Sequence, residues 1–311
     1  MLNSIKNEIC HLVQSKISID ESLKKHTTFG VGGLAPLFIY PSDINDLKIV
    51  LKYSFENKIK TFFIGSGSNL LISDNGFDGI VICLSKSFKN FEFDDSLKAK
   101  IGSGVMLGHI VRTLTKKSVK GLESLIGVPG TLGGALIMNA GAYGSEISNY
   151  LVSIRSLSLN GKERSYLKKD LNFSYRFSSI PKDEIIVEAN FEFKTGDLNK
   201  INNQKKKVSQ SRKLHQPLTY RSAGSIFKNP NSKLAAGYLI DKADLKGVRI
   251  GDAEISTKHA NFIINHGYAS SDNILELIKI IKREVLNKFK INLELEVKLM
   301  GFNDSELEGI A

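Results

Sequence analysis

Apolar side chains recur with helical spacing in several stretches of the chain. The stretches predicted as amphipathic helices are residues 2–13, 44–58, 105–118, 233–243 and 270–289. Ser42 is the predicted N-cap of the second helix, because a serine hydroxyl can accept hydrogen bonds from the free amides of a first helical turn. A polar helix at roughly residues 197–212 marks the boundary to a third region.

Short apolar or alternating runs predict strands between these helices. They are residues 38–41, 61–65, 79–84, 91–101, 184–194, 260–267 and 291–301. Asn160-Gly161 lies between two further runs and predicts a hairpin over residues 151–167. Residues 36–84 therefore form a small α/β unit, and the whole chain is predicted to be an α+β protein in three parts.

The chain of 311 residues carries a formal net charge of +11, and most of its basic residues are lysines spread along the sequence. A basic chain can bind nucleic acid, a membrane surface or small anions. Scattered lysines argue against nucleic acid, which is read by clustered arginines. The run Lys205-Lys206-Lys207 is interpreted as a solvated helix face.

The spacing of the cysteines and histidines and the N-terminal sequence exclude further classes of protein. Cys10 and Cys83 lie far apart without a CxxC pair, and the six histidines are scattered, so we expect neither a disulfide scaffold nor a metal site. The N-terminus carries Glu8 and lacks the apolar core of a secretory signal. No stretch approaches the length of a membrane span. The sequence predicts a cytoplasmic protein without a membrane partner.

Two glycine-rich loops could approach a ligand closely. GSGSNLL, residues 65–71, follows a predicted strand and is either a tight turn or an anion-binding nest of backbone amides. It is neither a Walker A loop nor a dinucleotide fingerprint. Six glycines fall within residues 127–146, a density that favours packing against something flat or anionic.

Ser225 lies in YRSAGSIFKNP, residues 220–230. The segment is either a plain loop ended by proline or a hydroxyl held as a proton donor or anion binder beside Lys228 and Asn229. The chain has no GxSxG elbow, so Ser225 is not predicted to be a triad nucleophile.

Six motifs occur in order along nearly the whole chain. They are HTTFGVGGLA (26–35), GSGSNLLISDNGFDGIVI (65–82), GVPGTLGGALIMNAGAYGSEI (127–147), YR (175–176), SAGSIFKNP (222–230) and LELEV (293–297). Together they resemble the UDP-N-acetylenolpyruvoylglucosamine reductase (MurB) family. Each motif is modest, but six in order with matching spacing are highly specific.

The resemblance implies a two-domain FAD-binding module of the vanillyl-alcohol-oxidase (PCMH) type, formed by residues 1–85 and 86–211. Residues 212–311 would form an α+β substrate-binding domain whose C-terminal strand returns to the active site. The short connection after Tyr175-Arg176 places the chain in the subgroup without a long Tyr-bearing insertion. The residues that would hold FAD are Gly65, Ser66, Gly67, Ser68, Asn69, Leu70, Gly127, Pro129, Gly130, Thr131, Gly134, Asn139, Gly141 and Ala142.

The family reaction reduces the enolpyruvyl ether of UDP-N-acetylglucosamine to a lactyl ether, giving UDP-N-acetylmuramate for peptidoglycan precursor synthesis. NADPH is the hydride donor, FAD carries the hydride, and the nucleotide-sugar is the partner molecule. The resemblance makes Arg176, Ser225 and Glu296 catalytic. It makes Tyr175, Arg176, Lys228 and Asn229 substrate-binding.

In this scheme Ser225 would donate a proton to C2 of the substrate, and Arg176 would hold its carboxylate with a planar fork. Glu296 would be protonated, with a raised pKa, or would act through Arg176. Glu294 competes with Glu296 for this role, and both could be solvent-facing carboxylates of one strand. Arg176 could likewise be a structural ion-pair partner.

Two positions depart from the family pattern. Gly30 stands where many members carry a basic residue, and Arg221 stands where proline is common. The rival functions are an FAD oxidase acting on another small molecule and a basic nucleic-acid-binding protein. We expect a monomer.

Overall fold

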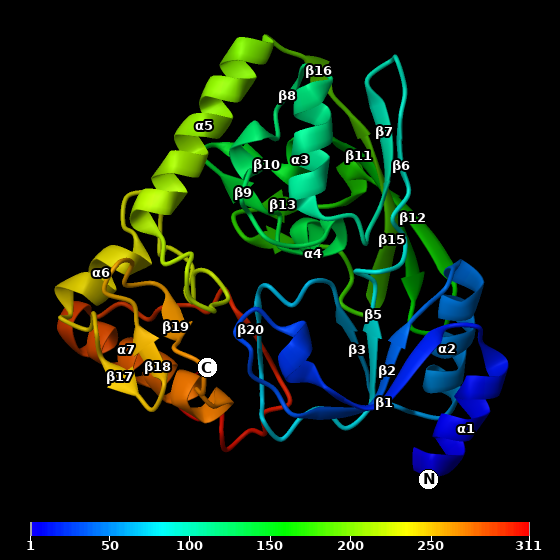
Figure 1. Ribbon diagram of the computed structural model, residues 1–311, viewed down its shortest axis with the longest axis horizontal. Coiled ribbons are helices and arrows are strands. Elements are labelled where there is room, and N and C mark those ends of the chain that lie inside the picture. Colours follow the sequence, from blue (N-terminus) through cyan, green and yellow to red (C-terminus); the bar gives the residue numbers. More distant parts are fainter. Residues whose placement is uncertain (1, 311) are drawn as a thin grey trace. The chain divides into compact units, whose positions relative to one another are not determined.

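The structure is a computed structural model that describes residues 2–310. The chain divides into two compact units, coloured along the sequence in Figure 1. The first holds the described residues up to Asp20 together with Pro36–Ser66 and Gly79–Gln210. The second holds Glu21–Ala35, Gly67–Asp78 and the described residues from Ser211 onwards.

The N-terminal part of the first unit is built on a sheet with the strand order β1-β2-β5-β3. β2 and β3 both run parallel to β5, which lies between them. Its strands and helices are β1 (Lys16–Ser22), β2 (Leu34–Tyr40), β3 (Thr61–Ile64), β5 (Ile80–Cys83), α1 (Leu2–Leu12) and α2 (Ile44–Glu56). Leu47 and Leu51 of α2 pack with Ile39 and Ile82 in one buried cluster, so the predicted α/β unit is confirmed.

The N-cap of α2 is Asp43, so the prediction of Ser42 is wrong. The Asp43 carboxylate accepts hydrogen bonds from the amides of Asn45 at 2.7 Å and Asp46 at 2.9 Å. The Ser42 amide instead donates to Ser15 Oγ at 3.3 Å. A carboxylate satisfies free helix amides and also favours the positive end of the helix dipole.

The other large sheet of the first unit is antiparallel and has five strands, in the order β12-β11-β15-β7-β6. The strands are β6 (Phe91–Phe93), β7 (Lys98–Gly102), β11 (Leu151–Ser158), β12 (Glu163–Leu167) and β15 (Glu184–Glu192). The hairpin at Asn160-Gly161 is confirmed, with Gly161 at φ +79°. The single strand predicted over residues 91–101 is wrong, because Asp94 Oδ1 accepts from the Lys98 amide at 2.9 Å and turns the chain into the β6–β7 hairpin.

Helices and short pairings complete this unit. They are α3 (Leu107–Lys116), α4 (Leu132–Ile137), α5 (Leu198–His215), β8 (Val119–Lys120), β9 (Gly141–Ala142), β10 (Ser145–Glu146), β13 (Phe173–Ser174), β14 (Phe177–Ser178) and β16 (Lys194–Thr195). Leu114 of α3 and Leu136 of α4 share a buried cluster with Phe191 of β15. In α5, which continues into the second unit, Ile201 and Val208 are the buried residues, as a polar helix requires.

The second unit has its own apolar core, which includes Phe29, Phe227, Ile240 and Ile278. Its elements are β4 (Leu70–Ile72), α6 (Ala236–Lys242), β17 (Arg249–Ile250), β18 (Ala253–Ile255), β19 (Ile263–Asn265), α7 (Ser271–Phe289) and β20 (Lys298–Met300). β17, β18 and β19 form an antiparallel sheet, and α7 lies against β17 and β18 (Figure 1). β20 pairs in parallel with β4.

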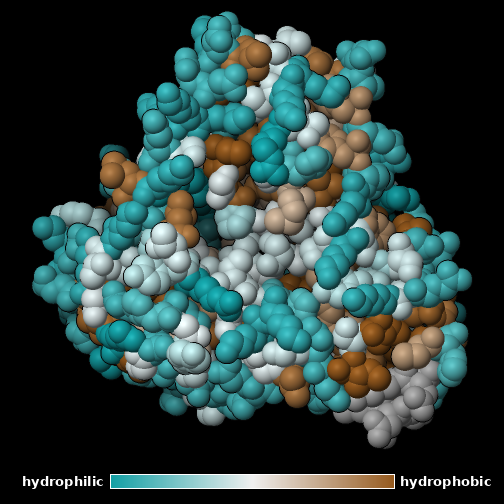
Figure 2. Space-filling view, in the orientation of Figure 1, coloured by the Kyte–Doolittle hydropathy of each residue, from teal (hydrophilic) through white to brown (hydrophobic). Residues whose placement is uncertain are grey.

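The strand predicted over residues 291–301 is confirmed only for its last part, β20. Upstream, the amides of Lys228 and Glu296 donate to the carbonyls of Glu294 and Ile226, at 2.9 and 2.8 Å. Phe227 and Leu295 therefore form an isolated antiparallel bridge, in place of a continuous strand before β20. Polar residues cover most of the face drawn in Figure 2. No helix within residues 2–310 is long and apolar enough to cross a membrane.

Candidate active site

The glycines in the loop between β3 and β4 lie close to neighbouring parts of the protein. A side chain at Gly65 would collide with Thr131 Oγ1 in the first unit. Gly67 has φ +63°, and a side chain there would collide with the His26 carbonyl in the second unit. The Gly67 carbonyl accepts from the Thr28 amide at 3.1 Å. Glycine is therefore required at both positions by contacts within the protein itself.

The second glycine-rich segment surrounds α4. Gly127 and Gly130 have φ values of +78° and +137°, which only glycine adopts readily. A Cβ at Gly133 would lie 3.2 Å from Ser103 Cβ, so α4 packs closely on the turn after β7. A Cβ at Gly141 would lie 2.9 Å from Glu146 Cγ. Part of the glycine density that we attributed to a ligand thus serves packing inside the first unit.

Asn139, directly after α4, is fully buried and has φ +41°. Its amide donates to Glu146 Oε2 at 2.8 Å and to the Ser174 carbonyl at 3.0 Å. Asn139 Oδ1 and Ser103 Oγ are buried, and neither has a hydrogen-bond partner among the described residues. Unpaired buried oxygens are rare because each costs about 1–3 kcal/mol. Their presence beside α4 fits a bound molecule that supplies the missing polar contacts.

Asn139 also positions the hairpin that carries Arg176. The bond from Asn139 reaches Ser174 in β13, and Ser178 Oγ in β14 donates to the Ile137 carbonyl at 2.9 Å. Arg176 lies between these strands at φ +54°, with its guanidinium 5.0 Å from the centre of the Tyr175 ring. Asn139, a predicted cofactor residue, therefore helps to hold the hairpin that carries Tyr175 and Arg176, the predicted substrate residues.

Ser225 lies in a segment fixed by Asn261, a buried residue that the sequence analysis missed. Asn261 accepts from the Phe227 amide at 3.0 Å and donates to the Phe227 carbonyl at 2.8 Å through its side chain. The Asn261 carbonyl accepts from the Ile226 amide at 2.9 Å. Ser225 itself is half-buried, and its hydroxyl makes no hydrogen bond within residues 2–310. The hydroxyl is therefore available to donate.

The same segment brings Glu296 and Asn69 to Ser225. The Ile226 carbonyl accepts from the Glu296 amide at 2.8 Å. Asn69 Nδ2 donates to the Glu296 carbonyl at 3.0 Å, and the Asn69 carbonyl accepts from Lys298 at 3.0 Å. Asn69 from the first glycine loop, Ser225 and Glu296 thus lie together in the second unit.

Glu294 and Glu296 differ in exposure, which separates the two candidates. The Glu294 side chain is 76% exposed and lies 3.2 Å from Lys228 Nζ, whereas Glu296 is half-buried. Glu294 is thus a surface partner of Lys228. Asn229 accepts from the Ala236 amide at 3.0 Å and so supports the start of α6. Lys228 and Asn229 both have structural partners that the sequence analysis did not foresee.

His259 adds a neutral side chain near this segment. Its ring lies against Phe262, 4.8 Å between centroids, and its Nδ1 accepts from the Asn261 amide at 3.3 Å. Burial lowers the pKa of His259 below 6.5, and the nearby charges of Lys246 and His215 lower it further. The ring is therefore neutral at neutral pH.

Two family models match separate parts of the chain. The C-terminal domain of UDP-N-acetylenolpyruvoylglucosamine reductase matches residues 216–300, and the FAD binding domain matches residues 35–165. The UDP-N-acetylenolpyruvoylglucosamine reductase of Clostridium tetani is 40% identical over 298 residues, which cover 96% of each chain. That of Clostridioides difficile is 40% identical over 291 residues, which cover 93% of this chain and 95% of the relative.

A solved structure agrees with the sequence relatives. The crystal structure of the Thermus caldophilus UDP-N-acetylenolpyruvylglucosamine reductase (MurB) has a TM-score of 0.79 and 33% identity. The match covers 93% of this chain and 99% of the Thermus chain. The predicted fold class, with its FAD-binding module, and the predicted resemblance are both confirmed. The chain belongs to the UDP-N-acetylenolpyruvoylglucosamine reductase family.

Proposed function

We propose that the chain reduces enolpyruvyl-UDP-N-acetylglucosamine to UDP-N-acetylmuramate, as an FAD-dependent oxidoreductase with NADPH as co-substrate, in peptidoglycan precursor synthesis. The observation that carries the residue roles is Ser225, a half-buried hydroxyl without a partner among the described residues, in a segment bonded to Glu296. When bound, FAD supplies hydride transfer from NADPH to the enolpyruvyl group.

The residues that would hold FAD are those predicted from the motifs. The polar side chains among them are Ser66, Ser68, Asn69, Thr131 and Asn139. The unpaired Asn139 Oδ1 supports this assignment, because a buried acceptor without a protein partner can accept a hydrogen bond from a bound molecule. The amides of Leu132 and Gly133, at the start of α4, are already bonded to the Val105 and Ser103 carbonyls. We therefore assign FAD contacts to the segments on either side of those amides.

Ser225 donates the proton that C2 of the substrate takes up after hydride reaches C3. A serine is a weak acid, but an enolate carbon is basic enough to accept its proton when the geometry is right. The bonds from Asn261 and Glu296 to residues 226 and 227 fix the position of Ser225. Arg176 binds the substrate carboxylate, where charge develops in the transition state. Glu296 assists at the same carboxylate, either directly or through Arg176, with Tyr175, Lys228 and Asn229 as further substrate contacts.

The remaining parts of the proposal concern the whole chain. We propose residues 1–85 and 86–211 as the FAD-binding subdomains and residues 212–311 as the substrate-binding domain. We further propose a cytoplasmic monomer that binds a nucleotide-sugar. A scattered lysine surface suits an anionic small molecule better than a nucleic acid.

An anaerobic spectrum tests this function in one sample. The purified protein should show a flavin absorption band that bleaches with NADPH and returns when enolpyruvyl-UDP-N-acetylglucosamine is added. A band that returns only with oxygen would favour an oxidase acting on another molecule. No flavin band after reconstitution with FAD would refute the proposed cofactor and function together.

A further inference from the structure

The two departures from the family pattern, Gly30 and Arg221, meet in the second unit. A Cβ at Gly30 would lie 2.9 Å from Arg221 Cδ and 3.1 Å from Arg221 Cζ. The guanidinium of Arg221 therefore occupies the space that a side chain at position 30 would fill. A basic group stands beside position 30 although residue 30 itself is glycine.

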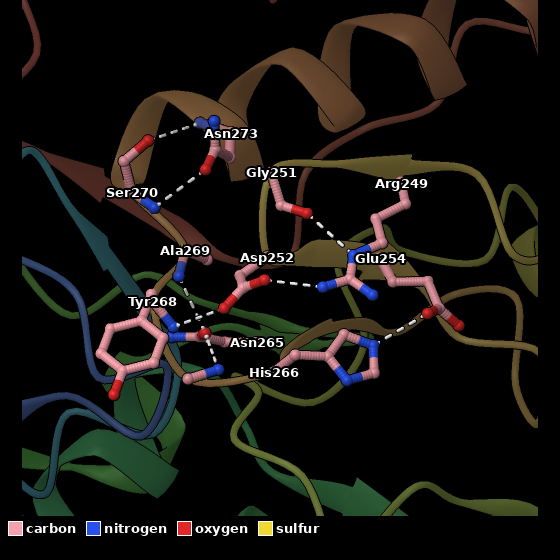
Figure 3. A network of polar contacts seen from close by, with 11 residues as sticks. Arg249, Gly251, Asp252, Glu254, Asn265, His266, Tyr268, Ala269, Ser270 and Asn273 are labelled. Atoms are coloured by element: carbon pink, nitrogen blue, oxygen red, sulfur yellow. Dashed lines mark hydrogen bonds and ion pairs between the residues drawn. The ribbon is translucent and has the colours of Figure 1, made fainter.

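A buried asparagine fixes the two segments against each other. Asn265 is 3% exposed, and its backbone amide donates to the Arg221 carbonyl at 2.9 Å. Its side-chain amide donates to the Phe29 carbonyl at 2.9 Å. Asn265 Oδ1 accepts from the Ala269 amide at 3.1 Å, a contact drawn in Figure 3. The position of Arg221 over Gly30 is thus held by the backbone on both sides.

The Gly30 loop is also bonded to the first glycine-rich loop. Thr28 donates to the Gly67 carbonyl at 3.1 Å, and the His26 carbonyl lies against Gly67. Asn69, two residues after Gly67 in the same loop, donates to the Glu296 carbonyl. Arg221 is therefore attached to a loop, residues 67–69, for which we propose FAD contacts.

The positive charge of Arg221 is not paired with an acidic group among residues 2–310. Arg221 is exposed and makes no hydrogen bond or ion pair through its side chain to any other residue between 2 and 310. Two other arginines of this unit do have acidic partners: Arg249 lies 2.6 Å from Asp252, and Arg283 lies 2.9 Å from Glu284. Figure 3 shows the Arg249 pair.

We propose that Arg221 binds a diphosphate and that Gly30, whose φ of +70° itself favours glycine, also leaves room for its guanidinium. A guanidinium offers a planar fork of donors that matches phosphate oxygens. The diphosphate is that of FAD or that of the nucleotide-sugar, so the inference rests on the proposed function. Arg221 supplies from a neighbouring segment the positive charge that position 30 lacks.

The test measures binding rather than turnover. FAD affinity is measured by fluorescence titration of the apoprotein, and UDP affinity by calorimetry on the FAD-loaded protein. Arg221→Ala should weaken one of the two ligands by about tenfold or more, as expected when a hydrogen-bonded charge is lost. Arg221→Gln, which keeps the stem and an amide, should give a smaller loss. Arg283→Ala removes an exposed, paired arginine of the same unit and should change neither affinity.

Gly30→Ala provides an independent variant, because the new methyl group would push the guanidinium aside without removing its charge. It should weaken the same ligand in the wild-type background and have a much smaller effect in the Arg221→Ala background, where only the backbone strain of alanine at φ +70° remains. Weaker FAD binding would identify the cofactor diphosphate, and weaker UDP binding would identify that of the substrate.

Two outcomes separate the inference from the function on which it rests. Unchanged affinity for both ligands in Arg221→Ala and Arg221→Gln would overturn the role of Arg221, even with a lower melting temperature. A wild-type protein that binds neither FAD nor UDP would overturn the proposed function itself.

Discussion

A serine hydroxyl is a weak acid, so Ser225 can protonate a carbon only after hydride transfer has made that carbon strongly basic. Ser225→Ala should therefore leave FAD binding and flavin reduction by NADPH unchanged. Reoxidation by the enolpyruvyl nucleotide should slow by about 10² to 10⁴-fold, the usual contribution of a positioned acid. Anaerobic stopped-flow absorbance measures the two half-reactions separately.

A second serine provides the control for this prediction. Ser232 is exposed and lies seven residues downstream, outside the predicted site. Ser232→Ala should change neither half-reaction. Equal reoxidation rates in wild type and Ser225→Ala would remove Ser225 from the mechanism.

Arg176 tests whether a planar fork is needed at the substrate carboxylate. Arg176→Lys keeps one positive charge but loses the paired donors, worth about 1.5–3 kcal/mol for hydrogen bonds to charged groups. We expect kcat/KM to fall roughly tenfold to a hundredfold. Arginine and lysine carry the same backbone strain at the φ of +54° found at position 176, so the melting temperature should stay the same. Wild-type steady-state rates in a folded Arg176→Lys variant would contradict the role.

At the scale of single elements, the start of α2 offers a matched pair of variants. Asp43→Ala removes a carboxylate that accepts from two helix amides and should lower the free energy of unfolding by about 0.5–2 kcal/mol. Ser42→Ala removes the cap that the sequence favoured and should cost less than about 0.5 kcal/mol. Urea unfolding measures both, and a larger loss in Ser42→Ala would reverse the assignment.

The elements also show what the sequence could and could not predict. Most helices and the longer buried strands followed from apolar spacing. The short helix α4 was not predicted, because its segment is rich in glycine. The Asp94 turn was missed because the residues on both sides of it alternate like one strand. Residues 293–297 were predicted as part of a strand, but they form only an isolated antiparallel bridge with residues 226–228. This pairing joins distant segments, so the local sequence does not contain it.

At the scale of the whole molecule, the sequence named candidate site residues but not the residues that hold them in place. Ordered motifs identified Asn69, Ser225 and Glu296, which the second unit does bring together. Asn261 and Asn265 were missed, because a single asparagine in an apolar run does not reveal what its side chain will bond. The packing of Arg221 on Gly30 was also missed. Nearly two hundred residues separate the two positions, so no local pattern in the sequence joins them.

His259 makes the stability of the whole protein depend on pH. Its folded-state pKa lies below 6.5, mainly because burial penalises the charged ring. Below about pH 6.5 the unfolded chain takes up a proton that the folded protein resists, so the free energy of unfolding should fall as the pH is lowered through this range. Above it, both states are neutral at this position and the contribution is constant.

His259→Asn separates this effect from other titrating groups. An asparagine oxygen can replace Nδ1 as the acceptor for the Asn261 amide, but it does not titrate. Urea unfolding at several pH values should show that wild type loses stability relative to His259→Asn below pH 6.5, with a constant difference above pH 7.5. Parallel curves at all pH values would mean that His259 has the same pKa in both states, and the neutral ring inferred beside Asn261 would then be wrong.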